Sequence, residues 1–87
     1  MNTAAKNWCV YVLRCADRTL YCGITNDLPR RLKQHTSGTG ARYTRGRGPL
    51  KLVCSWLEPD KSSALKAEIA FKKLTRRAKL AVIKARK

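Results

Sequence analysis

Acidic side chains are scarce in this chain, whereas basic ones are abundant. Five Asp and Glu stand against 20 Lys and Arg among 87 residues, so the formal net charge is +15. A charge surplus of this size repels itself in the folded state unless salt or a polyanion neutralises it. Membrane binding would need a basic helix with a strong apolar face, whereas basic residues here also fill a glycine-rich segment in mid-chain. We therefore expect the partner to be nucleic acid and not a membrane.

Long apolar runs and closely spaced cysteine pairs are also missing. No run is long enough to span a bilayer, and the first residues contain no apolar core of a signal peptide. The four cysteines, Cys9, Cys15, Cys22 and Cys54, form no CxxC pair, which argues against a tetrahedral zinc site. We expect reduced, buried thiols in a cytoplasmic protein.

Length and composition favour one globular domain. With 44% hydrophobic and 29% charged residues, the chain has the composition of a folded protein. A domain of this size buries only roughly 60–65% of the surface that its unfolded chain exposes. We expect a single domain over residues 1–87 with a thin core.

Three apolar runs have the character of strands. Residues 8–15 are apolar on both alternating faces, which is typical of a strand covered on each side. The polar tetrad 16–19 predicts a hairpin turn, and residues 20–24 predict the returning antiparallel strand. Residues 50–57 predict a third strand, with one face formed by Leu50, Leu52, Cys54 and Trp56.

Helix start signals separate and follow these strands. Asp27 and Pro29 predict a helix over residues 28–36, Asp60 opens a second helix, and Thr75 caps a third. The second helix carries an apolar stripe formed by Ala64, Ala67, Phe71 and Leu74. The order β-β-α-β-α-α predicts an α+β fold, with a small antiparallel sheet flanked by helices.

Glu68 is the one acidic residue that the pattern places inside a regular element. The other four belong to a turn, a helix cap and a connection. With no second acid near it in sequence, a two-metal centre is disfavoured, but one carboxylate suffices for a single Mg²⁺ that keeps much of its water shell. The plainer interpretation is an ion pair between Glu68 and Lys72 at i,i+4 spacing.

Four further positions have both a chemical and a structural interpretation. Arg31 and His35 lie four apart on the first helix, so they project from one face as a phosphate ligand and a proton carrier, or as a solvated arginine and a histidine near a helix C-terminus. Tyr11 faces Tyr21 across the predicted hairpin, where both could simply hold the sheet together. A tyrosine base is demanding chemistry, because only about 0.1% of a phenol of ordinary pKa is ionised at pH 7.

Taken together, these residues resemble the GIY-YIG nuclease superfamily. The resemblance rests on the order and spacing of Cys9-Val10-Tyr11, Tyr21-Cys22-Gly23, Arg31, His35 and Glu68. More narrowly, the segments WCVYVLRC, LYCGIT, RRLKQH, GARYTRGRGP and AEIAFKKLTRRAK are similar to those of its small bacterial single-domain branch.

The resemblance implies a three-stranded sheet and hydrolysis of phosphodiester bonds at a site with one metal ion, Mg²⁺ or Mn²⁺. It assigns Tyr11 as the general base, Tyr21 as its assistant and Arg31 as the group that stabilises charge on the phosphate. Glu68 would hold the metal, His35 matches a histidine of some members, and Gly23 would let backbone approach the phosphate. The chain departs from the pattern at Cys9-Val10 and Cys22, and it has no asparagine after Glu68 such as several homing-type members carry.

The surplus basic residues predict how nucleic acid is held. Arginines of the glycine-rich segment and cations near the last helix junction would contact phosphates without reading sequence. These residues are Arg42, Arg45, Arg47, Lys51, Lys72, Lys73, Arg76, Arg77 and Lys79. Few aromatic side chains remain for stacking single-stranded bases, so DNA recognised by shape is favoured over RNA.

Three functions stay open at this point. The first is a metal-dependent DNA endonuclease of low sequence specificity or structure selectivity, with a role in DNA repair or recombination. The second is a non-catalytic nucleic-acid-binding module on the same scaffold. The third is a subunit that acts only with a protein partner, which would supply the specificity that this chain has no further domain to provide.

Overall fold

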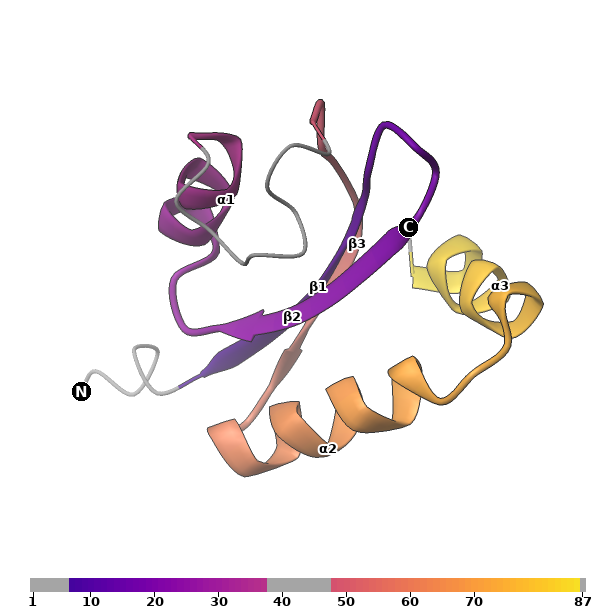
Figure 1. Cartoon of the computed structure of the whole chain (residues 1–87). Coiled ribbons are helices and arrows are strands. Elements are labelled where there is room, and N and C mark those ends of the chain that lie inside the picture. The colour runs from indigo at the N-terminus through magenta and orange to yellow at the C-terminus, as the bar shows by residue number, and fades with distance from the viewer. Residues whose placement is uncertain (1–6, 38–47, 87) are drawn as a thin grey trace.

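The fold consists of a small sheet between helices, as the computed structural model shows over residues 7–37 and 48–86 (Figure 1). The elements in order are β1 (Trp8–Arg14), β2 (Leu20–Thr25), α1 (Leu28–Thr36), β3 (Lys51–Glu58), α2 (Lys61–Lys72) and α3 (Arg76–Arg86). The predicted order of strands and helices and the α+β class are confirmed.

The sheet has β1 at its centre. In the described segments the strand order is β2-β1-β3, and both pairings are antiparallel. Figure 1 shows α1 on one side of the sheet and α2 with α3 on the other. Both faces of β1 are therefore covered, which is why its central residues are apolar or aromatic without alternation and fully buried.

Each face of β1 belongs to a different core cluster. Val10 and Val12 pack with Phe71 and Ile83 from the two later helices. Tyr11 and Leu13 point the other way, and Leu28 and Leu32 of α1 pack against them. The four cysteines are free and buried, as the sequence predicted for these thiols.

The helices begin where the cap residues predicted. The Asp27 carboxylate accepts a hydrogen bond from the Arg30 backbone N–H at 3.2 Å. Asp60 does the same for Ser63 at 2.8 Å, and the Thr75 hydroxyl accepts from Ala78 at 3.1 Å. These side chains satisfy N–H groups that have no partner within the first turn of a helix.

The prediction that Leu50, Leu52, Cys54 and Trp56 form one face of the third strand is wrong. Val12 pairs with Cys54 but Leu13 pairs with Leu52, so Val53 is an extra residue in the strand. This bulge reverses the alternation of side chains. Cys54 therefore packs on the side of α2 and α3, whereas Leu50 packs on the side of α1.

The end of α2 also differs from the sequence pattern. The helix ends at Lys72, so Leu74 lies in the connection to α3 and is 37% exposed instead of extending the buried stripe. In the two described segments, no helix is both long and apolar enough to cross a bilayer.

Gly23 on β2 makes room for Tyr11. The two residues are directly paired across β1 and β2. A Cβ atom at Gly23 would lie 2.6 Å from the Tyr11 hydroxyl oxygen and 2.7 Å from the ring carbon that bears it. Because Tyr11 is fully buried, its ring has no free space into which to move.

Replacing Gly23 by alanine should therefore destabilise the protein. We expect Gly23→Ala to lower the free energy of unfolding by about 1–3 kcal/mol, as overpacking of a core does. Urea denaturation followed by circular dichroism under reducing conditions measures this. The control is Gly48→Ala, because a Cβ atom there meets no atom within 4 Å; we expect it to stay within about 0.5 kcal/mol of the parent. Equal stability of the two variants would contradict the packing described.

Candidate active site

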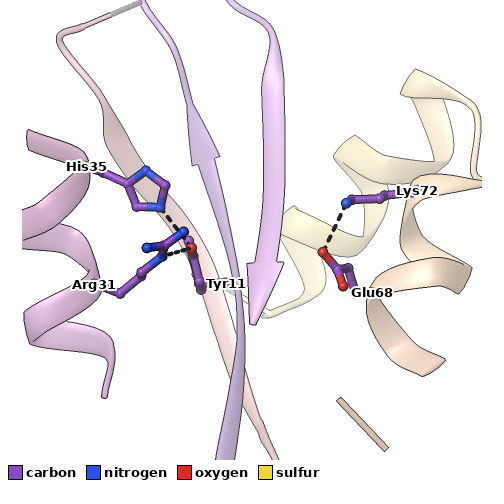
Figure 2. A network of polar contacts seen from close by, with 5 residues as sticks. All are labelled: Tyr11, Arg31, His35, Glu68 and Lys72. Atoms are coloured by element: carbon purple, nitrogen blue, oxygen red, sulfur yellow. Dashed lines mark hydrogen bonds and ion pairs between the residues drawn. The ribbon is translucent and has the colours of Figure 1, made fainter. Parts of the chain in front are cut away.

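A buried polar cluster lies between β1 and α1. The Tyr11 hydroxyl oxygen is 2.8 Å from His35 Nε2, and Arg31 Nε donates a hydrogen bond to it at 3.2 Å (Figure 2). Arg31 and His35 lie one turn apart on α1, as their spacing predicted. Tyr11 is at 0% exposure and His35 at 3%, so these two side chains are closed to solvent in this arrangement, whereas Arg31 is only partly buried.

The protonation of this cluster follows from its burial. Burial, and next the charge of Arg31, lower the pKa of His35 below its usual 6.5. Burial raises the pKa of Tyr11 to about 12, and the opposing effect of the Arg31 hydrogen bond is smaller. Near neutral pH the imidazole and the phenol are therefore both uncharged. The stabilised phenolate that a tyrosine base needs is absent from this arrangement.

Tyr21 lies beside the cluster at the edge of the sheet. It pairs with Leu13, so it stands diagonally to Tyr11 and not directly opposite it. Its ring centroid is 6.2 Å from that of Tyr11 and 5.3 Å from that of His35. Tyr21 also lines a pocket of about 380 Å³ that reaches Lys72 on the other side of β2.

Glu68 stands apart from the other four predicted catalytic residues. It lies on α2, and the strands separate it from Tyr11, Arg31 and His35 in Figure 2. Its Oε2 is 2.9 Å from the ammonium of Lys72, with the Glu68 side chain 16% exposed. The predicted i,i+4 ion pair is therefore present. β2 lies between Glu68 and the Tyr11 cluster in Figure 2. Glu68 is near the buried face of that strand, because its charge adds to the effect of burial, which is larger, in raising the pKa of Cys22.

Glu68 suits a single hydrated metal ion better than a dehydrated one. Among residues 7–37 and 48–86, no three His, Cys, Asp or Glu side chains gather as a ligand set. Mg²⁺ tolerates this, because it keeps several waters and needs only one or two carboxylates beside substrate phosphates. The Lys72 ammonium also shows that a cation fits against this carboxylate.

The residues predicted to contact nucleic acid differ in their exposure to solvent. Arg76 and Arg77 are exposed at the start of α3, and Lys79 lies 5.8 Å above the Phe71 ring centroid. Gly23 is buried against Tyr11. Lys51, Lys72 and Lys73 are exposed as well. The other predicted residues, Arg42, Arg45 and Arg47, lie outside the described residues.

The sequence reasoning missed Gln34. Its side-chain oxygen accepts a hydrogen bond from Arg31 Nη1 at 2.9 Å and so fixes the guanidinium that Tyr11 also contacts. Both residues line a pocket of about 290 Å³ at the start of α1. The i,i+3 spacing of Arg31 and Gln34 on a helix was the signal that could have identified this pair.

Comparison with known proteins gives consistent matches. The family model described as the GIY-YIG catalytic domain matches residues 7–81. A UPF0213 protein of Lactiplantibacillus plantarum is 54% identical over 86 residues, which cover 97% of this chain and 85% of the relative. The UPF0213 protein BH0048 of Halalkalibacterium halodurans is 51% identical over 73 residues, covering 84% of this chain and 78% of the relative.

A solved structure extends the match to the fold. The solution NMR structure of the UPF0213 protein BH0048 from Bacillus halodurans aligns with a TM-score of 0.61 at 47% identity, covering 91% of this chain and 84% of that one. Sequence motifs, strand order and relatives therefore agree. The chain belongs to the GIY-YIG family, in its small single-domain bacterial branch.

Proposed function

We propose that this protein is a metal-dependent endonuclease that hydrolyses phosphodiester bonds of DNA with low sequence specificity or with structure selectivity. The observation that supports this most is the hydrogen-bonded cluster of Tyr11, Arg31 and His35. A protein this small gains little stability from burying the polar groups of Tyr11 on β1 and His35 on α1, because buried polar groups cost stability unless they are paired. Their arrangement suits proton transfer next to a phosphate.

Arg31 would be the group that meets the substrate. A guanidinium binds two phosphate oxygens at once, and it remains charged at every relevant pH. In the free protein Arg31 also helps to cover the Tyr11 hydroxyl. Its movement toward a phosphate would therefore uncover Tyr11 for an attacking water.

The raised pKa of Tyr11 makes a proton relay preferable to a preformed phenolate. The attacking water would give its proton to the Tyr11 oxygen while the Tyr11 hydroxyl passes its own proton to His35 Nε2, 2.8 Å away. The uncharged imidazole is ready to accept, because its pKa lies below its usual value. Hydroxide would then attack the phosphorus, and His35 would carry the proton as an imidazolium.

Glu68 would hold one Mg²⁺ or Mn²⁺ ion. When bound, such an ion supplies positive charge that stabilises the pentacoordinate phosphate and its leaving oxygen. Because the carboxylate and the Tyr11 cluster lie on opposite sides of β2, the DNA backbone would have to cross that strand at the edge of the sheet. Tyr21, which borders both sides, would then lie beneath it.

A non-catalytic nucleic-acid-binding module is the second candidate. The closed state of the Tyr11 hydroxyl and the position of Glu68 across β2 favour it. Both candidate functions predict salt-sensitive affinity for DNA, because both rest on the net charge of +15. Cleavage separates the two candidates.

The first test is cleavage of supercoiled and forked DNA with Mg²⁺ or Mn²⁺. We expect the parent to nick these substrates, Tyr11→Phe and Arg31→Ala to be slower by roughly 10²–10⁴-fold, and Glu68→Gln to be inactive, because each removes a proton-transfer, charge-stabilising or metal-holding group. Gel-based rates at low salt measure this.

The matched control is Glu58→Gln. Glu58 accepts a hydrogen bond from Trp56 Nε1 at 2.9 Å on β3, and glutamine keeps an acceptor there, so cleavage should stay at the parental rate. No cleavage by the parent with either metal, alone or with cell extract that could contain a partner, would leave only the binding module.

The second test uses the titration of His35. It is the one histidine in the chain, so its ring signals in an NMR spectrum are unambiguous. We expect a midpoint below 6.5, and a higher midpoint in Arg31→Ala, because that change removes one of the two causes that lower the pKa. Cleavage should fall as the pH drops through this midpoint, since an imidazolium accepts no further proton.

Arg30→Ala is the control for this titration. Arg30 is an exposed neighbour on the same helix, so its removal should leave the midpoint nearly unchanged. A parental midpoint at or above 6.5, or equal effects of the two arginine changes, would contradict the relay.

A further inference from the structure

The Lys72 ammonium lies against the carboxylate of Glu68, the proposed metal ligand. The two side chains are 2.9 Å apart, and the Lys72 side chain is 53% exposed. The hydrogen bond to Glu68 is the main reason that the pKa of Lys72 is raised, so this lysine stays charged over the whole range in which nucleic acid is bound. A divalent cation that approaches the carboxylate must displace this ammonium or share the carboxylate with it.

The electrostatic cost of sharing is considerable. Two unit charges about 4 Å apart in water repel by a free energy that corresponds to roughly fivefold in an equilibrium constant, and a divalent ion doubles that free energy. Lys79 adds a second ammonium near Lys72, since both line one pocket beside β2. The net charge of +15 opposes cation binding further. Glu68 should therefore be a weak metal ligand in the free protein.

Lys72 has an alternative position open to it. It lines, together with Tyr21 and Lys79, the pocket of about 380 Å³ beside β2. A half-exposed lysine side chain on the last turn of α2 changes rotamer at little cost, because an i,i+4 ion pair contributes only about twofold to an equilibrium constant. A DNA phosphate at this pocket would attract the ammonium away from Glu68.

We propose that Lys72 couples metal binding to DNA binding: it neutralises Glu68 in the free protein and transfers to a phosphate when DNA binds, so that the metal ion enters together with the nucleic acid. This rests on the proposed role of Glu68 as the metal ligand. Coupling between two ligands is reciprocal, so a metal ion at Glu68 must also strengthen DNA binding by releasing Lys72. A lysine that only stabilises α2 would produce no such coupling.

The experiment measures Mn²⁺ binding to the DNA-free protein, using the electron paramagnetic resonance signal of unbound Mn²⁺. We expect Lys72→Met to bind Mn²⁺ roughly 5–30-fold more tightly than the parent. Lys72→Arg keeps the charge and should resemble the parent. Lys73→Met removes the neighbouring charge, for which the structure records no ion pair with Glu68, and should change affinity at most twofold. Circular dichroism confirms folding.

The double variant Glu68→Gln/Lys72→Met tests whether the additional Mn²⁺ binds at the Glu68 carboxylate. The gain in Mn²⁺ affinity should disappear in the double variant, because the carboxylate is gone. The inference is overturned if Lys72→Met binds no more tightly than Lys73→Met, or if the gain survives without the carboxylate.

DNA binding provides the reciprocal measurement. Fluorescence anisotropy with Ca²⁺, at constant ionic strength and with gels to confirm intact DNA, should show a larger Ca²⁺-dependent rise in affinity for the parent than for Lys72→Met. Screening by Ca²⁺ acts equally on both proteins, so it cancels in the comparison. An equal rise in both would overturn the coupling.

These outcomes are separable from those of the nuclease proposal. Lys72-dependent Mn²⁺ affinity in a protein that never cuts DNA would keep this inference and remove the nuclease. Efficient cleavage by a protein whose Mn²⁺ affinity does not depend on Lys72 would support the nuclease proposal and overturn this inference.

Discussion

The hydrogen bonds at the Tyr11 hydroxyl impose the main constraint on this molecule. The phenol lies on the central strand and is buried, so its oxygen must find partners inside the protein. α1 supplies both, Arg31 and His35, from successive turns. On the opposite side, β2 leaves space only because Gly23 has no Cβ atom. This one hydroxyl group therefore joins β1 to α1 by hydrogen bonds and requires a glycine opposite it on β2.

The edge strand β2 divides the candidate site. Tyr11, Arg31 and His35 lie on one side of it, and Glu68 with Lys72 lies on the other (Figure 2). In the free protein each half is internally satisfied: the phenol is covered by Arg31, and the carboxylate is neutralised by an ammonium. Both cations are groups that bind phosphate well. Under the proposed function, a polyanion across β2 would draw both cations away from their partners and so expose the proposed proton acceptor and the proposed metal ligand in one event.

Local signals predicted most of the fold, and long-range packing accounts for what they missed. Asp27, Asp60 and Thr75 cap their helices through neighbouring N–H groups, so sequence alone identified them. The bulge at Val53 was not predictable, because it depends on how β3 pairs with β1. For the candidate site, spacing predicted that Arg31 and His35 share a face and that Glu68 pairs with Lys72. Two features of the site could be seen only in the assembled sheet. Gly23 leaves space for the Tyr11 ring, and burial keeps the Tyr11 phenol neutral by raising its pKa.

The tautomer of His35 tests the central interaction most directly. The account requires the proton of the neutral ring to be on Nδ1, so that Nε2 accepts the hydrogen bond from Tyr11. The ¹⁵N chemical shifts of this one histidine ring at neutral pH distinguish the two tautomers. We predict an unprotonated Nε2 in the parent and a loss of that preference in Tyr11→Phe. A protonated Nε2 in the parent would contradict the account, because that nitrogen could then not accept the proton of the Tyr11 hydroxyl.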